Sequence, residues 1–119
     1  MNVRGVDFIY YEVLDIGKSK SFYSDTLGLK VSSESEGQWI EFDLGNVTLG
    51  IGSYSQGGVG GSMAALAVDN VSTAVEELKE RGVPVTMGPE DFPGCTMAVI
   101  TDPDGNKLML HARKDGSCG

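Results

Sequence analysis

The stretch "DPDGNKLMLH" (Asp102–His111) specifies a β-hairpin close to the end of the chain. Pro103 presets φ for the first central position of a turn, Asp104 suits the second, and Gly105 supplies a positive φ. The flanking segments, "CTMAVI" and "KLMLH", have the apolar and β-branched character of strands. His111, the only histidine of the chain, follows this turn. Its place raises the question of whether it belongs to a metal or catalytic site.

The hairpin is the last part of a pattern that occurs twice in the chain. Aligning Asp15 with Asn70 places a strand-like run before each residue and a helix-like run after it. Nearly the same offset aligns Gly28 with Gly82, and glycine is expected just past a helix C-terminus because it tolerates left-handed backbone. Asp15 and Asn70 are the predicted N-caps, with Ser72 as an alternative in the second half. Each half therefore reads strand–helix–strand–strand–strand.

Apolar residues recur at helical spacing after each predicted cap. They are Ile16, Phe22, Tyr23 and Leu27 in the first half, and Val71, Ala74, Val75 and Leu78 in the second. The segment "QWIEFDLG" alternates as a strand does, with Ile40, Phe42 and Leu44 on one face and Trp39, Glu41 and Asp43 on the other. The Gly/Ser-rich stretch "GSYSQGGVGG" (Gly52–Gly61) is predicted to link the two halves.

Composition and charge narrow the class of protein. The 119 residues fit one domain. The formal net charge of −8 argues against nucleic-acid and anionic-membrane binding, which both need a basic face. The N-terminus has no apolar signal region, and the longest apolar run, "MAALAV", is too short to span a bilayer. We therefore expect a cytoplasmic protein whose two cysteines, Cys95 and Cys118, are reduced thiols.

The repeat, with "FYSDTLGLKV" after the first helix and "DPDGNKLML" in the last hairpin, resembles the vicinal oxygen chelate superfamily. That group includes glyoxalase I, the extradiol dioxygenases and the bleomycin-resistance proteins. The resemblance runs from about Val6 to His111. It implies an α+β fold of two tandem βαβββ modules that form an open eight-stranded cup with the helices outside. We expect one domain over residues 1–119, with modules at about 5–53 and 62–113 joined by a linker at 54–61, and a homodimer.

The resemblance also identifies where a metal would be bound. In the enzymes of the family, four side chains hold a divalent cation, one near the start of the first strand and one on the last strand of each module. The matching positions here are Phe8 and Gly50 in the first module, with Leu49 in place of Gly50 if the turn register slips, and Met63 and Met109 in the second. None of these residues offers the N or O donor that such a cation needs. We therefore expect no metal and no other cofactor.

Strand alternation indicates which side chains line the cup. If Phe8 faces it, Tyr10 and Glu12 do too, while Ile9, Tyr11 and Val13 face the helices. If Met109 faces it, so do Lys107 and His111, while Leu108 and Leu110 pack toward the second helix. The predicted ligand-binding residues are Phe8, Tyr10, Glu12, Trp39, Glu41, Met63, Met109 and His111. Trp39, the only tryptophan, has acidic neighbours on its face and is predicted to stack on a cationic or aromatic ligand.

Glu12 and His111 are the candidate catalytic residues. A carboxylate in a partly apolar pocket has a raised pKa and serves as a general base, and histidine does acid–base work near neutral pH. The alternatives are that Glu12 pairs with Lys107 or Arg113 and that His111 lies in water at the strand end. A further alternative is a displaced metal site made of Glu12, Glu41 and His111.

The predicted function is binding of a small organic molecule, aromatic or cationic, without the family's metal and with sequestration as its purpose. Apolar linings with a few polar groups are typical of such sites, and methionines adapt to ligand shape. The alternative is a lyase or isomerase, or a dioxygenase-like enzyme, that uses a displaced metal site or Glu12 as base. A third possibility is a cup filled by its own side chains.

Overall fold

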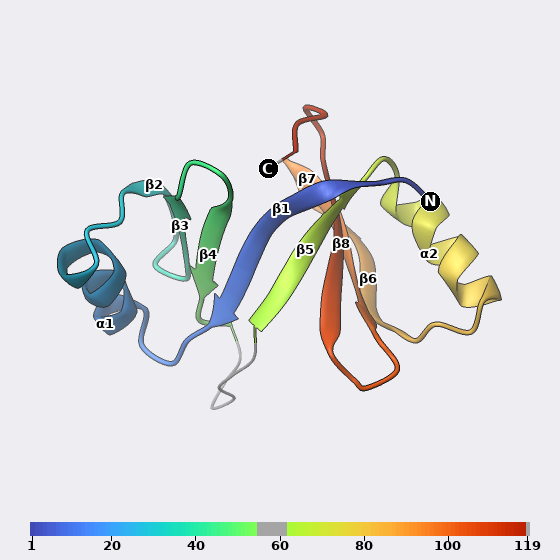
Figure 1. Cartoon of the computed structure of the whole chain (residues 1–119), viewed down its shortest axis with the longest axis horizontal. Helices are drawn as coiled ribbons and strands as arrows, with labels where there is room; N and C mark the ends of the chain where they lie inside the picture. The colour runs from blue at the N-terminus through green and yellow to red at the C-terminus, as the bar shows by residue number, and fades with distance from the viewer. Residues whose placement is uncertain (55–61, 119) are drawn as a thin grey trace. The chain divides into compact units, whose positions relative to one another are not determined.

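The computed structural model describes residues 1–54 and 62–118, and Figure 1 shows its helices and strands. The chain divides into two compact units. We call Phe8–Ser62 the first unit, and Met1–Asp7 together with Met63–Gly119 the second unit. Most of the predicted linker, residues 55–61, lies outside the described residues.

Residues 8–54 of the first unit form one helical segment and four strands. In chain order these are the end of β1 (Val3–Glu12), α1 (Ile16–Lys20), the π-helical turn η1 (Ser21–Thr26), β2 (Val31–Ser35), β3 (Trp39–Asp43) and β4 (Thr48–Gly52). Their strand order is β2-β3-β4-β1. Strand β4 runs antiparallel to β3 and parallel to β1, so it lies between them.

The second unit repeats this order. It contains the start of β1, then β5 (Ser62–Val68), α2 (Val71–Glu80), β6 (Val85–Asp91), β7 (Cys95–Thr101) and β8 (Lys107–Arg113). Strand β8 is parallel to β5 and antiparallel to β7, which is antiparallel to β6. Hydrogen bonds connect all the strands in the order β2-β3-β4-β1-β5-β8-β7-β6, a mixed eight-stranded sheet that does not close. The predicted α+β fold of two βαβββ modules is confirmed.

Matching backbone features mark the helix ends in both units. The side chain of Asp15 accepts a hydrogen bond from the Lys18 N–H at 3.0 Å, and that of Asn70 accepts one from the Thr73 N–H at 2.9 Å. Asn70 is therefore the cap of α2, rather than Ser72. Gly28 and Gly82 have φ values of 75° and 78°, the left-handed conformation predicted for both. The repeat in the sequence is a repeat in the structure.

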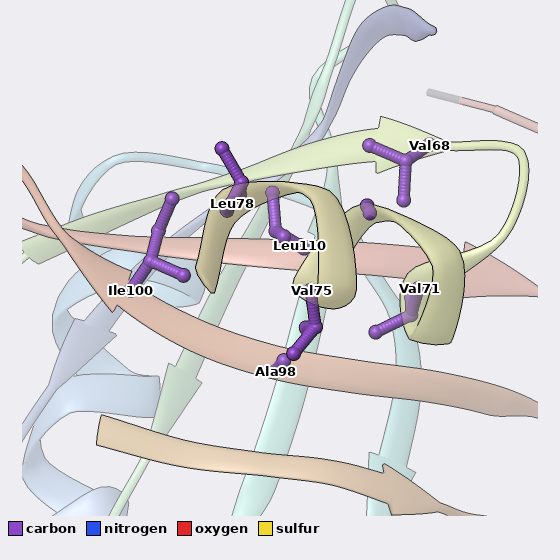
Figure 2. Packing of buried hydrophobic residues seen from close by; sticks show 8 residues of the cluster. Val68, Val71, Val75, Leu78, Ala98, Ile100 and Leu110 are labelled. Atoms are coloured by element: carbon purple, nitrogen blue, oxygen red, sulfur yellow. The ribbon is translucent and has the colours of Figure 1, made fainter. Parts of the chain in front are cut away.

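Each unit has its own apolar core. In the second unit, Val71, Ala74, Val75 and Leu78 of α2 pack against Val68, Ala98, Ile100 and Leu110 of the strands, as Figure 2 shows. In the first unit, Ile16 and Tyr23 pack against Ile40, Phe42, Leu49 and Ile51 of β3 and β4. Because the helix covers this face in each unit, the alternate residues of the same strands lie on the opposite face.

The turn between β7 and β8 has the predicted form. The Asp102 carboxylate accepts hydrogen bonds from the backbone N–H groups of Asp104 and Asn106 at 2.9 and 2.8 Å, and Gly105 has a φ of 86°. This turn fixes the register in which Val99 faces Met109 and Met97 faces His111. Both cysteines are free thiols, with Cys95 half-buried and Cys118 exposed.

Five apolar residues predicted to be buried are exposed instead. Phe22 and Leu27 are 50% and 52% exposed. The helix widens to a π-helical turn after Lys20, which shifts later side chains off the α-helical stripe and leaves Tyr23 on the core. Ile9, Tyr11 and Leu44 are 37%, 40% and 41% exposed. Ile9 and Tyr11 pair with Leu49 and Ile51, so they lie on the helix face of the sheet as predicted. They are exposed because α1 packs on residues of β3 and β4 and does not cover β1.

Neither helix within the described ranges has the length and apolar character needed to cross a membrane.

Candidate functional site

The predicted site residues fall into two groups. Phe8, Tyr10, Glu12, Trp39 and Glu41 belong to the first unit, and Met63, Met109 and His111 belong to the second. The structure brings the five residues of the first unit together on β1 and β3. It places the three residues of the second unit on β5 and β8. That all eight line one cup stays a prediction.

Aromatic rings gather on the face of the first unit opposite α1. The rings of Tyr10 and Trp39 are stacked, with centroids 5.4 Å apart and planes 10° from parallel. Phe8 meets Trp39 edge-on at 5.7 Å, and Tyr54 lies tilted against Trp39 at 6.4 Å. We call Phe8, Tyr10, Trp39 and Tyr54 the aromatic group. Phe8 and Tyr10 are buried, Trp39 is half-buried and Tyr54 is exposed, so the group is open to solvent on one side.

Two glycines of β4 make room for this group. Gly50 faces Tyr10 on one side and Glu41 on the other, and Gly52 faces Glu12 and Trp39. A Cβ atom on Gly50 would lie 2.9 Å from Cη2 of Trp39. A Cβ atom on Gly52 would lie 2.7 Å from Oη of Tyr10. Both rings therefore lean over β4, where any larger residue would displace them.

Each carboxylate of the site is held by an aromatic residue two positions earlier on the same strand. The Tyr10 hydroxyl donates to Oε1 of Glu12, and the Tyr54 N–H donates to Oε2 at 2.8 Å. Nε1 of Trp39 donates to Oε2 of Glu41 at 2.7 Å. Residues two apart in a strand share a face, which is why each pair can meet. The hydrogen bonds fix the positions of both carboxylates beside the rings.

The tyrosines of the aromatic group retain their protons at neutral pH. Burial raises the pKa of Tyr10 above its ordinary value, and so do the hydrogen bond to Glu12 and the negative charge of that residue. Burial also raises the pKa of Tyr54, with a contribution from the charges of Glu12 and Glu36. Tyr10 is therefore a stable hydrogen-bond donor to Glu12. That Glu12 itself acts as a base stays a prediction.

The second unit contains a buried contact between a carboxylate and an imidazole that the sequence did not reveal. Oδ2 of Asp7 lies 2.7 Å from Nδ1 of His111, and Asp7 is completely buried. Arg113 also approaches Asp7, with its guanidinium 3.9 Å from Oδ1 and donating to the backbone carbonyl at 3.5 Å. The expectation that His111 lies in water at the strand end is wrong, since only 7% of it is exposed. Its partner Asp7 holds it inside the unit.

Methionines surround the histidine on β7 and β8. Met109 lies two residues before His111 on the same face, and Met97 faces His111 across the strand pair. Both are buried, whereas Met63 is half-buried. Sequence reasoning missed Met97. Its place in "CTMAVI", at the alternation that pairs with His111, is the signal that could have found it.

The register settles which residue of the first unit corresponds to Met109. Met109 faces Ala65 across the parallel pair β5–β8, and Gly50 faces Tyr10 across the parallel pair β1–β4. Tyr10 and Ala65 have the same spacing along the chain as the two helix caps, Asp15 and Asn70. Gly50, and not Leu49, is therefore the counterpart of Met109.

The residues at these positions do not fit the divalent cation that the resemblance implies. Phe8 and Gly50 have no donor atom in their side chains, and the thioethers of Met63 and Met109 are soft ligands unsuited to a hard cation. In residues 1–54 and 62–118, no group of three or more His, Cys, Asp or Glu side chains is placed to hold a metal ion. The absence of a cofactor stays a prediction for a measurement of metal content.

Comparison with known proteins identifies a family and several proteins of similar sequence. The model of the glyoxalase/bleomycin resistance protein/dioxygenase superfamily matches residues 5–110. The chain is 31% identical to lactoylglutathione lyase of Salmonella typhimurium, over 88% of this chain and 90% of that protein. It is 29% identical to metallothiol transferase FosB of Staphylococcus haemolyticus, over 92% of this chain and 84% of that protein.

Solved structures show the same fold at low sequence identity. A Streptomyces coelicolor methylmalonyl-CoA epimerase superposes with a TM-score of 0.75 at 16% identity, covering 99% of this chain and 100% of that one. A superfamily member from Vibrio splendidus 12B01 superposes with a TM-score of 0.70 at 18% identity, covering 93% and 99%. These likenesses concern the fold alone.

Proposed function

Because the chain belongs to the glyoxalase/bleomycin resistance protein/dioxygenase superfamily, we propose that it binds a small organic compound, aromatic or cationic, without the metal of the family's enzymes. The observation that carries this proposal is the stack of Tyr10 and Trp39 over the glycines of β4, with Glu12 and Glu41 beside it. The purpose we assign to such binding is sequestration, in a cytoplasmic homodimer.

The chemistry of the aromatic group supports a ligand with a flat ring or a positive charge. A ring face carries negative partial charge, so it attracts a cation and stacks against another aromatic ring. A carboxylate adds attraction for a cation, and this attraction is stronger at a partly desolvated position than in bulk water. Trp39 and Tyr54 are accessible to a ligand, and Glu12 and Glu41 are half-buried next to them. The family's name includes bleomycin resistance protein, which is consistent with a binding role.

A titration with three compounds of one shape tests the proposal. Benzyltrimethylammonium, benzyl alcohol and benzenesulfonate share a phenyl ring and differ in charge. We expect calorimetry to show saturable binding of the cation, weaker binding of the neutral compound and none of the anion. Trp39→Ala should abolish binding of the cation. Phe22→Ala is the matched control, because it removes an exposed ring of the same unit that lies in the helical segment and should leave binding unchanged.

A lyase or isomerase with Glu12 as general base is the second candidate function. The observation in its favour is the 31% identity to a lactoylglutathione lyase over most of both chains. An assay of lactoylglutathione turnover, with and without added divalent metal, separates the two functions. Turnover that Glu12→Gln abolishes, with the fold intact, would favour the enzyme. A dioxygenase-like activity at a displaced metal site of Glu12, Glu41 and His111 would instead require stoichiometric bound metal.

A further inference from the structure

The two carboxylates of the aromatic group lie at opposite corners of a three-strand patch. Glu12 is on β1 beside Gly52, and Glu41 is on β3 beside Gly50. Glu12 and Glu41 therefore lie two strands apart across the sheet and two residues apart along the strand direction. With ordinary strand geometry this places their Cα atoms about 12 Å apart. The stacked rings of Tyr10 and Trp39 lie over β4, between Glu12 on β1 and Glu41 on β3.

Hydrogen bonds fix the carboxylates of both Glu12 and Glu41. Glu12 accepts hydrogen bonds from the Tyr10 hydroxyl and the Tyr54 N–H, and Glu41 accepts one from Trp39 Nε1. Each carboxylate is therefore fixed relative to the rings, and the distance between the two negative charges is a property of the fold. A ligand lying on the rings would meet one negative charge at each end.

We propose that the preferred ligand of this site is an elongated dication whose two positive charges are separated by the span from Glu12 to Glu41. The proposal rests on the proposed binding function and narrows its ligand class. The apolar middle of such a ligand packs on the accessible ring surfaces of Trp39 and Tyr54, and each cationic end pairs with one carboxylate. A compound with one positive charge pairs with only one of the two carboxylates, Glu12 or Glu41.

A series of α,ω-bis(trimethylammonium) alkanes measures this span directly. The butane, hexane, octane and decane compounds are titrated by calorimetry, with octyltrimethylammonium as the monocation of matched length. We expect the octane compound to bind best, since its nitrogens lie about as far apart as the Cα atoms of the two corners. It should bind about fivefold more tightly than octyltrimethylammonium, the gain that one additional partly exposed ion pair provides.

Charge variants assign the two ends. Glu12→Gln and Glu41→Gln should each reduce binding of the octane compound to the level of octyltrimethylammonium. Glu76→Gln, which removes an exposed charge from α2 in the other unit, should preserve the difference. Equal binding of the monocation and the octane compound would overturn the dication proposal while leaving the proposed function in place. Failure of every compound, including benzyltrimethylammonium, would overturn the proposed function itself.

Discussion

The indole of Trp39 lies against Gly50 so closely that a Cβ atom at position 50 would be 2.9 Å from its Cη2 atom. In the second unit the corresponding position is Met109, whose side chain is buried. The space at this position of the repeat is therefore filled differently in the two units. In the first unit the ring of Trp39 from the neighbouring strand covers Gly50, and in the second unit the side chain of Met109 itself fills it. In neither unit does this position present a ligand for a hard cation.

Gly50→Ala should displace the indole of Trp39. A contact of this closeness in a packed group forces side chains off their preferred positions, and we expect a loss of about 1–3 kcal/mol in the free energy of unfolding. The fluorescence emission of Trp39, the only tryptophan, should shift as its surroundings change. Urea denaturation and an emission spectrum measure the two effects.

Two controls make that test specific. Gly94→Ala adds a methyl group where nothing lies within 4 Å, so it should change stability by less than about 0.5 kcal/mol. In a Trp39→Ala background, the cost of Gly50→Ala should disappear, because the clash partner is gone. An undiminished cost in that background would mean that Trp39 is not what limits position 50.

Tyr10→Phe should weaken the first unit and change its response to alkaline pH. The variant loses the hydrogen bond to Glu12, and bonds to a charged group are worth about 1.5–3 kcal/mol. The folded state raises the pKa of Tyr10, so the unfolded chain loses this proton first, near pH 10. The stability contributed by Tyr10 is thus full below that pH and falls as pH rises above it.

Denaturation curves of the wild type and Tyr10→Phe across this alkaline range measure the effect. The stability of the wild type should fall more steeply with pH than that of the variant. Parallel curves would show that Tyr10 titrates alike in the folded and unfolded chain, which contradicts the hydrogen bond to Glu12 in solution.

Asp7→Ala should be among the most damaging substitutions in the second unit. It removes the buried hydrogen-bond partner of His111, and leaving a buried polar group without its partner costs about 1–3 kcal/mol. Asp7→Asn should recover part of this loss, since its amide oxygen can accept a hydrogen bond from Nδ1 of the imidazole. Glu34→Gln, which breaks the exposed ion pair with Lys20, should cost less than about 1 kcal/mol. Chemical denaturation ranks the three, and equal effects of Asp7→Ala and Glu34→Gln would refute the buried pair.

Chelation of divalent metal should leave the protein unchanged. The positions matched to the family's metal ligands, Phe8, Gly50, Met63 and Met109, have no oxygen or nitrogen donor in their side chains. We expect protein purified without chelator to contain well under one equivalent of metal, and EDTA to leave its melting temperature in place. A drop in melting temperature that added metal restores would show that a metal site exists elsewhere in the protein.

Local signals in the sequence predicted the parts of the fold that depend on neighbouring residues. The caps Asp15 and Asn70, the glycines at 28 and 82, and the turn at Asp102 act within a few residues of themselves. The alternation of "QWIEFDLG" likewise assigned Trp39 and Glu41 to one face. These features need no knowledge of the rest of the chain.

Features that depend on distant contacts were missed. Asp7 pairs with a residue 104 positions away, and a lone aspartate between Val6 and Phe8 looks like an exposed strand position. Tyr54 lies in the glycine-rich stretch assigned to the linker, yet its N–H and ring both reach the site. The π-helical turn that exposes Phe22 has no counterpart in the hydrophobic pattern. Each of these features depends on a contact between distant residues or on a local backbone conformation, and the spacing of apolar residues in the sequence does not indicate either one.

The most direct test of the central claim is the dissociation constant of benzyltrimethylammonium, measured by calorimetry on protein dialysed against EDTA. The claim predicts saturable binding at one site per chain, unchanged when divalent metal is added back and lost in Trp39→Ala. Absence of binding, or binding that appears only after metal is restored, would contradict it.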